Sequence, residues 1–199
     1  MPDEKTIPPL LVIAGLRGFG KSHYVYLNID HSKPILCLDF RGQMAKKFNQ
    51  PETKSRFGMM DQLRHDTTPQ VFYRPGQEDY PIGGEGGDID YFLINASCCE
   101  NIQIIIDELD YAIPNHRYPN SFPKFLDDSR TQNLPVYITC HRIHEGSPKL
   151  RALADFVCFR MQSKKDLNFL EELGEKEKVD QIKKLKRFEF VIISPELQE

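Results

Sequence analysis

The chain has 199 residues, of which 40% are apolar and 28% charged, and its formal net charge is −3. These values suit one medium-sized globular domain spanning 1–199. They exclude the strongly basic composition of many nucleic-acid binders, although a local basic patch or a ring of subunits could still bind DNA. No apolar run reaches the ~20 residues of a membrane span, and the polar first residues lead us to expect no signal peptide. The five cysteines lack disulfide spacing, which predicts buried, reduced thiols in a cytoplasmic protein.

Strand-like and helix-like segments alternate along the chain, which predicts an α/β fold with a mainly parallel sheet. The strands expected in the first half are 10–14, 34–40 and 71–75. A helix is expected to begin near Lys21, and the glycine-rich segment 81–88 is expected to form a loop. Asp88 should cap a helix whose apolar face carries Ile89, Phe92, Leu93 and Ala96.

The second half continues the alternation. The strands expected there are 102–107, 135–140, 155–161 and 188–193, and the helices are a short one at 125–130, one after Ser163, and one at 175–184. Ser163 and Asp166 have the spacing of a helix-capping box. Residues 114–124 contain three prolines and are predicted to form a loop.

A glycine-rich loop follows the first predicted strand and precedes the first predicted helix. Residues 15–22, GLRGFGKS, fit the phosphate-binding pattern G-x-x-x-x-G-K-[ST]. Glycines let successive N–H groups turn toward a phosphate, and the helix N-terminus adds its dipole. Lys21 would reach the β- and γ-phosphates of ATP, and Ser22 would bind Mg²⁺. The residues expected at the nucleotide are Gly15, Arg17, Gly18, Gly20, Lys21, Ser22 and His23.

Two acidic residues end the most apolar predicted strand. Asp107 and Glu108 follow residues 102–106, and the carboxyl ends of parallel strands face the ligand. Asp107 is therefore expected to hold Mg²⁺, while Glu108 is placed to polarise an attacking water. A kinase must exclude water, so the acidic pair favours an ATPase.

A further set of polar residues surrounds the strand at 135–140. The strand ends in Thr139-Cys140-His141-Arg142, on the expected ligand side, where a polar residue could sense the γ-phosphate. Arg130 precedes the strand and is either a cation supplied to a neighbour's nucleotide or a surface partner of Asp127 or Asp128. Arg17 could approach the γ-phosphate, contact a neighbouring subunit or point to solvent.

The order of these motifs resembles the FtsK–HerA superfamily, and most of all the genome-packaging ATPases of double-stranded DNA viruses. The resemblance covers roughly residues 8 to 165. It implies a RecA-like core of the additional-strand type, with Lys21, Ser22, Asp107 and Glu108 as nucleotide residues and Arg130 acting in trans. The family usually has glutamine where this chain has His141. We expect the strand carrying Asp107 to lie beside the first strand, with the 135–140 strand next to it.

The resemblance also implies partners. These would be double-stranded DNA, further copies of the chain in a ring of five or six, and capsid or portal proteins, in the host cytoplasm or with the virion. The candidate DNA contacts are Lys46, Lys47, His116, Arg117 and Arg142. Because a ring repeats each basic residue by symmetry, few are needed per subunit.

Other functions would use some of the same residues. A small-molecule kinase would need an arginine-rich lid, and residues 140–165 look too strand-like for one. A filamentous-phage type of assembly ATPase usually carries a membrane segment, and a nucleotide switch would not need Glu108. Zinc could bind at Cys140, His141 and His144, but Cys140 lies in an apolar strand and the chain has no C-x-x-C.

Overall fold

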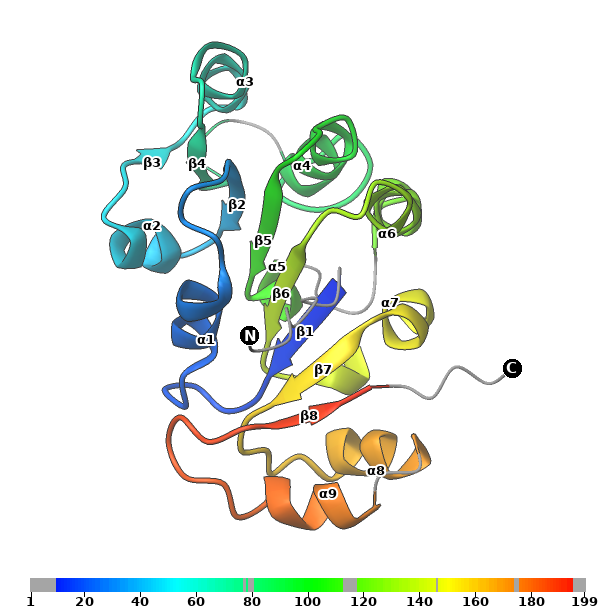
Figure 1. Cartoon of the computed structure of the whole chain (residues 1–199). Coiled ribbons are helices and arrows are strands. Elements are labelled where there is room, and N and C mark those ends of the chain that lie inside the picture. Colours follow the sequence, from blue (N-terminus) through cyan, green and yellow to red (C-terminus); the bar gives the residue numbers. More distant parts are fainter. Residues whose placement is uncertain are drawn as a thin grey trace.

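The computed structural model describes residues 10–76, 78, 81–112, 118–145, 147–173 and 176–194. Their strands form one eight-stranded sheet in the order β3-β4-β2-β5-β6-β1-β7-β8 (Figure 1). The strands are β1 Leu10–Ala14, β2 Ile35–Asp39, β3 Glu52–Thr53, β4 Gln70–Tyr73, β5 Gln103–Asp107, β6 Val136–Cys140, β7 Asp155–Cys158 and β8 Val191–Ile193. All pairings are parallel except that of β7 with β8. This confirms the predicted fold class.

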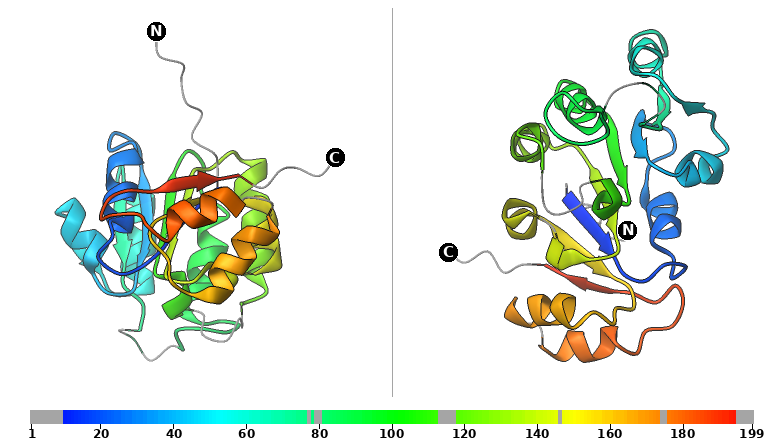
Figure 2. Two further views of the ribbon diagram at one scale, coloured as in Figure 1. Left: turned by 90° about the horizontal axis from the view of Figure 1, so that it is seen from below. Right: turned by 180° about the vertical axis from the view of Figure 1, so that it is seen from behind.

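Helices cover both faces of the sheet (Figure 2). Each face has its own apolar core. One face packs against α1 Lys21–Asn28 and α2 Gln43–Phe48 through side chains such as Val25 and Phe48. The other face is covered by α4 Asp88–Ala96, α6 Ser121–Thr131, α7 Pro148–Leu153, α8 Lys164–Glu172 and α9 Lys176–Ile182. The remaining helices are α3 Arg56–His65, α5 Leu109–Ala112 and the 3-10 turn η2 Ile143–Glu145.

The expected position of the Asp107 strand was wrong. β6 lies between β5 and β1, because its residue Val136 pairs with Ile104 on one side and Leu10 on the other. Every residue of β6 is buried, as the centre of a sheet requires. This order brings the end of β6 directly between the phosphate-binding loop and the acidic pair.

Asp88 does not cap α4 as predicted. Gly87 occupies the cap position, and no side chain caps the helix there. The buried Asp88 carboxylate instead pairs with Arg56 Nε at 2.9 Å and accepts hydrogen bonds from the Tyr73 hydroxyl and Gly76 N at 2.8 and 2.7 Å. The apolar face of α4 is confirmed, since Ile89, Phe92, Leu93 and Ala96 are buried.

Other differences from the sequence prediction are smaller. α6 begins at Ser121 rather than 125, with Pro123 in its first turn, where proline's missing N–H costs no helical bond. The cap of α8 is confirmed, because Ser163 accepts from Asp166 N. Cys98 is exposed in the turn after α4, contrary to the expected burial, while Cys37, Cys140 and Cys158 are buried and free. Among the described residues, no helix is long and apolar enough to cross a membrane.

Candidate nucleotide site

The loop between β1 and α1 has a backbone that requires glycine. Gly15, Gly18 and Gly20 have φ values of 141°, 81° and 116°, which L side chains rarely adopt. A Cβ at Gly15 would lie 2.8 Å from Phe159 Cβ, and one at Gly20 would lie 2.6 Å from Phe188 Cδ1. The loop is therefore wrapped tightly against neighbouring segments and leads straight into the N-terminus of α1.

Lys21, the first residue of α1, points back into this loop. Its Nζ donates to the carbonyls of Gly15 at 2.8 Å and Leu16 at 3.3 Å, and lies 3.2 Å from His141 Nδ1. Burial lowers the pKa of Lys21, and the nearby acids partly offset this. The ammonium is thus held at the loop, where a bound phosphate would compete with the carbonyls.

Asp107 lies at the end of β5, opposite Asp39 on β2. Its Oδ1 accepts a hydrogen bond of 2.6 Å from the Thr139 hydroxyl. Burial, assisted by the negative charges of Asp39 and Glu108, raises the pKa of Asp107 to about 7. A divalent cation here would therefore stabilise the charged form of this carboxylate.

Glu108 adopts a left-handed backbone conformation with φ 53°. Its N–H donates to Thr139 Oγ1 at 2.8 Å, so the Thr139 hydroxyl orients both acids. Glu108 Oε2 lies 2.6 Å from Arg41 Nε, an ion pair without hydrogen-bond alignment, and Oε1 lies 3.4 Å from His141 Nε2. A buried carboxylate is thus held between two basic side chains.

His141 connects the two halves of the site. Its backbone N–H donates to Asp110 Oδ2 at 3.1 Å, and its ring lies between Lys21 and Glu108. The neutral tautomer with a proton on Nε2 fits both neighbours, because Nδ1 can then accept from the Lys21 ammonium while Nε2–H faces the carboxylate. Burial raises the pKa of Asp110, and the hydrogen bond from the His141 backbone N–H opposes this.

These side chains surround an open cleft of about 360 Å³. The predicted residues that line it are Arg17, Gly18, Gly20, Lys21, Ser22, His23, Lys47, Asp107, Glu108 and His141. Lys47, expected at DNA, instead lies here with Nζ 3.2 Å from His23 Nδ1. Sequence reasoning missed Gln43, Arg187 and Phe188 in the lining, and the partner Arg41, because no motif marks them.

Several predicted residues lie away from the cleft. Arg130 is exposed at the end of α6, which leads into the amino end of β6. The glycine loop lies at the opposite, carboxyl ends of the parallel strands. Asp127, one of the suggested surface partners of Arg130, pairs with Lys149. Lys46 is exposed on α2, while His116 and Arg117 lie outside the described residues.

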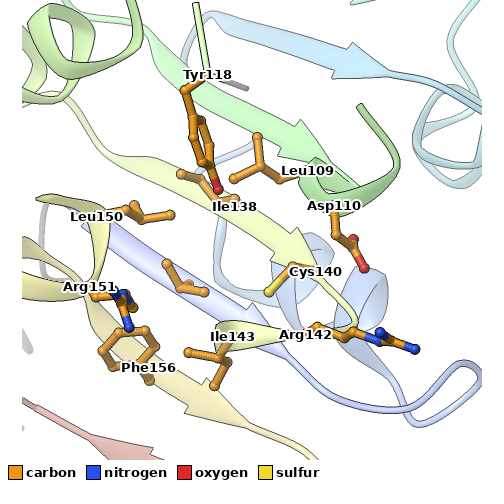
Figure 3. A pocket seen from close by; sticks show the side chains of 11 residues that line it. Leu109, Asp110, Tyr118, Ile138, Cys140, Arg142, Ile143, Leu150, Arg151 and Phe156 are labelled. Carbon is orange, nitrogen blue, oxygen red and sulfur yellow. The ribbon is translucent and has the colours of Figure 1, made fainter. Parts of the chain in front are cut away.

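On the side of β6 that faces away from the cleft, the side chains around its carboxyl end are closely packed. Figure 3 shows Cys140 turning its sulfur toward Ile143, while the Arg142 guanidinium extends away from this region. The gap there is only about 10 Å³, which holds at most one water. No trio of His, Cys, Asp and Glu side chains in the described part of the chain has the arrangement of a metal centre.

A magnesium ion with a nucleotide needs fewer protein ligands than such a centre. Mg²⁺ keeps several waters and takes one or two protein oxygens beside phosphate oxygens. The Ser22 and Asp107 side chains both line the cleft and offer a hydroxyl and a carboxylate. The donor set therefore fits Mg²⁺ bound together with a nucleoside triphosphate.

No protein-family model and no curated protein matches the sequence. Solved structures do match over nearly the whole chain. The genome packaging NTPase B204 from Sulfolobus turreted icosahedral virus 2 in complex with AMP aligns with TM-score 0.70 and 16% identity, covering 97% of this chain and 96% of that one. Its sulfate complex gives TM-score 0.72 at 16% identity over 96% and 94%. This chain has the B204 fold.

A further B204 structure agrees. B204 of Sulfolobus turreted icosahedral virus, described as a DNA-packaging ATPase, aligns with TM-score 0.67 and 16% identity over 96% of this chain and 95% of that one. B204 of virus 2 is also solved with AMPPCP and with ATP-gammaS. The resemblance predicted from the motifs is thereby confirmed at the level of the fold.

Proposed function

We propose that this chain is an ATPase that drives double-stranded DNA into a viral capsid. The observation that carries the proposal is the meeting of Lys21, Asp107 and Glu108 at one cleft between the glycine loop and the end of β5. The B204 fold supports it, since B204 proteins are named genome packaging NTPases.

The residues of the cleft have separate roles in ATP hydrolysis. The glycine-loop N–H groups and Lys21 hold the phosphates, and Ser22 and Asp107 hold Mg²⁺, which when bound neutralises phosphate charge. The water oxygen bonds to the γ-phosphorus while the bond to the β–γ bridging oxygen breaks, giving ADP and phosphate. Glu108 accepts the water proton and releases it to phosphate or solvent. His141, beside Lys21, donates toward charge that develops on the γ-phosphate.

Packaging requires more than one subunit. The chain forms a ring of five or six copies, and Arg130 of each reaches the nucleotide of its neighbour. Basic residues such as Lys46, Arg117 and Arg142 contact the DNA backbone in the channel. The ring works in the host cytoplasm, docked on capsid or portal proteins.

ATP turnover against protein concentration tests this function, with and without double-stranded DNA. We expect turnover to rise more than linearly with concentration and to increase with DNA, and we expect Glu108→Gln to abolish it while ATP still binds. A linear, DNA-independent turnover lost in Glu108→Gln would leave an ATPase and remove the translocase. Turnover unaffected by Glu108→Gln would contradict the assignment of the general base.

A further inference from the structure

An apolar surface adjoins the phosphate cleft. We call it the aromatic shelf, and its members are Tyr24, Leu27, Phe159, Phe188 and Phe190, with His23 at the edge. Leu27, Phe188 and Phe190 are 65%, 50% and 42% exposed, although they are large and apolar. The shelf bounds an open hollow of about 340 Å³, within the ~300–1,000 Å³ of typical small-molecule sites.

The shelf comes from segments that are far apart in the sequence. Figure 1 shows the chain before β8 passing beside the loop after β1 and the start of α1. Tyr24 and Phe159 each lie edge-to-face or tilted against Phe190, with ring centroids 5.0 and 5.8 Å away. The rings therefore support one another and need no bound molecule to hold their positions.

The shelf and the phosphate cleft form one continuous surface. Gly20, His23 and Phe188 line both. The backbone is joined there as well, since Phe188 N–H donates to Phe19 O at 2.9 Å and Arg187 Nε donates to Gly18 O at 3.1 Å. A molecule with phosphates on the glycine loop would thus have its other end beside exposed rings.

We propose that the aromatic shelf binds the base of the nucleoside triphosphate by stacking, with little discrimination between bases. The inference rests on the proposed function only in taking the glycine loop as the phosphate site. Stacking tolerates any base, because every base has a π-face. Strong base selectivity needs buried hydrogen-bonding groups, and the described lining offers only the side chains of His23 and Tyr24, of which His23 Nδ1 already contacts Lys47.

Binding of ATP, GTP and inorganic triphosphate to the full chain tests the shelf. We expect Phe190→Ala to weaken ATP and GTP by about tenfold and to leave inorganic triphosphate unchanged. Phe190→Trp should restore both nucleotides. ATP and GTP should bind the unmodified chain within about tenfold of each other. Phe57→Ala is the matched control, since Phe57 is 79% exposed on α3, at the opposite end of the sheet.

The possible outcomes distinguish a failure of the base-binding proposal from a failure of the proposed function. Equal binding of ATP and inorganic triphosphate by the unmodified chain, or an unchanged ATP affinity in Phe190→Ala, would overturn the shelf and leave the ATPase. A change of oligomeric state in Phe190→Ala without a change in ATP affinity would make the shelf a subunit contact and overturn the proposal. Triphosphate binding that survives Lys21→Ala would instead overturn the phosphate site itself.

Discussion

At the scale of single residues, Arg41 is the partner on which Glu108 depends. The Glu108 carboxylate is buried and lies beside Asp107, so removing the Arg41 guanidinium leaves a buried charge without its nearest cation. We expect Arg41→Ala to lower the free energy of unfolding by about 1–3 kcal/mol at pH 7. In a Glu108→Gln background the same change should cost less than half as much, because the charge is gone.

Urea unfolding of the four chains in this double-mutant cycle measures the coupling. Lys33→Ala is a suitable control, because it removes the exposed Lys33–Asp30 pair and should change little. Equal costs of Arg41→Ala in both backgrounds would mean that the ion pair does not stabilise the fold.

Asp107 gives the site a pH dependence. Its pKa is about 7 in the folded chain and about 4 when unfolded, so the folded state binds more protons between these values. The contribution of Asp107 to the free energy of unfolding is therefore fully present below pH 4 and is lost as the pH rises through 7. The unfolding free energy of the unmodified chain, relative to Asp107→Asn, should fall by up to about 4 kcal/mol between pH 4 and 8 without Mg²⁺. A difference that stays constant with pH would contradict the raised pKa.

Much of the candidate site could be predicted from the sequence, because a glycine loop and an acidic strand end are local patterns. Arg41 and Phe188 could not, since they reach the cleft only through the order of strands and the return of the chain beside β1. The end of the 135–140 strand pointed to His141, but its position between Lys21 and Glu108 depends on β6 lying between β1 and β5.

At the scale of elements, the apolar strands were predicted close to their true positions, although β7 ends at Cys158 rather than 161 and β8 begins at Val191 rather than 188. The short elements α2, α3 and β3 were not predicted. α3 buries a single residue, Met59, so it has no apolar stripe that a sequence pattern can reveal. α2 buries Met44, Ala45 and Phe48, but its six residues are too few for a clear helical period. β3 has two residues. These elements form because of their neighbours.

Asp88 shows how such neighbours are joined. It connects α4 to α3 through Arg56 and to the end of β4 through Tyr73 and Gly76. We expect Asp88→Ala to cost about 3–4 kcal/mol of unfolding free energy, because it leaves a partly buried guanidinium, a hydroxyl and an N–H with lost partners. Urea unfolding measures this, with the exposed Asp180→Ala as a control expected to show no change. A cost no larger than that of losing an ordinary helix cap would mean that these contacts of Asp88 contribute little to stability.

At the scale of the whole molecule, the glycine loop lies at the carboxyl ends of the parallel strands, whereas Arg130 lies near their amino ends. A proposed ring with Arg130 acting in trans therefore needs a head-to-tail arrangement. In it, the Arg130 side of each copy meets the nucleotide cleft of the next copy. The sequence could suggest this arginine by resemblance, but a single chain has no feature that fixes a neighbour's position.

Mixing inactive variants tests the trans role. Lys21→Ala and Arg130→Ala should each lose ATP turnover, and an equimolar mixture should recover about a quarter of the original activity, because some interfaces combine an intact Lys21 with an intact Arg130. A mixture of Lys21→Ala with Glu108→Gln is the control, since both changes damage the same half of the site and no intact site forms. Recovery no greater than in this control would show that Arg130 does not act in trans.

The contact between the glycine loop and residues 187 and 188 has a consequence for synthesis of the chain. The hydrogen bond from Arg187 to Gly18 joins residues 169 positions apart. The ribosome makes the glycine loop early, yet the segment that braces it emerges only after all the strands from β1 to β7. A nascent chain that ends before residue 187 would therefore lack this brace, and we expect nucleotide binding to mature late in translation, when the protein is nearly complete.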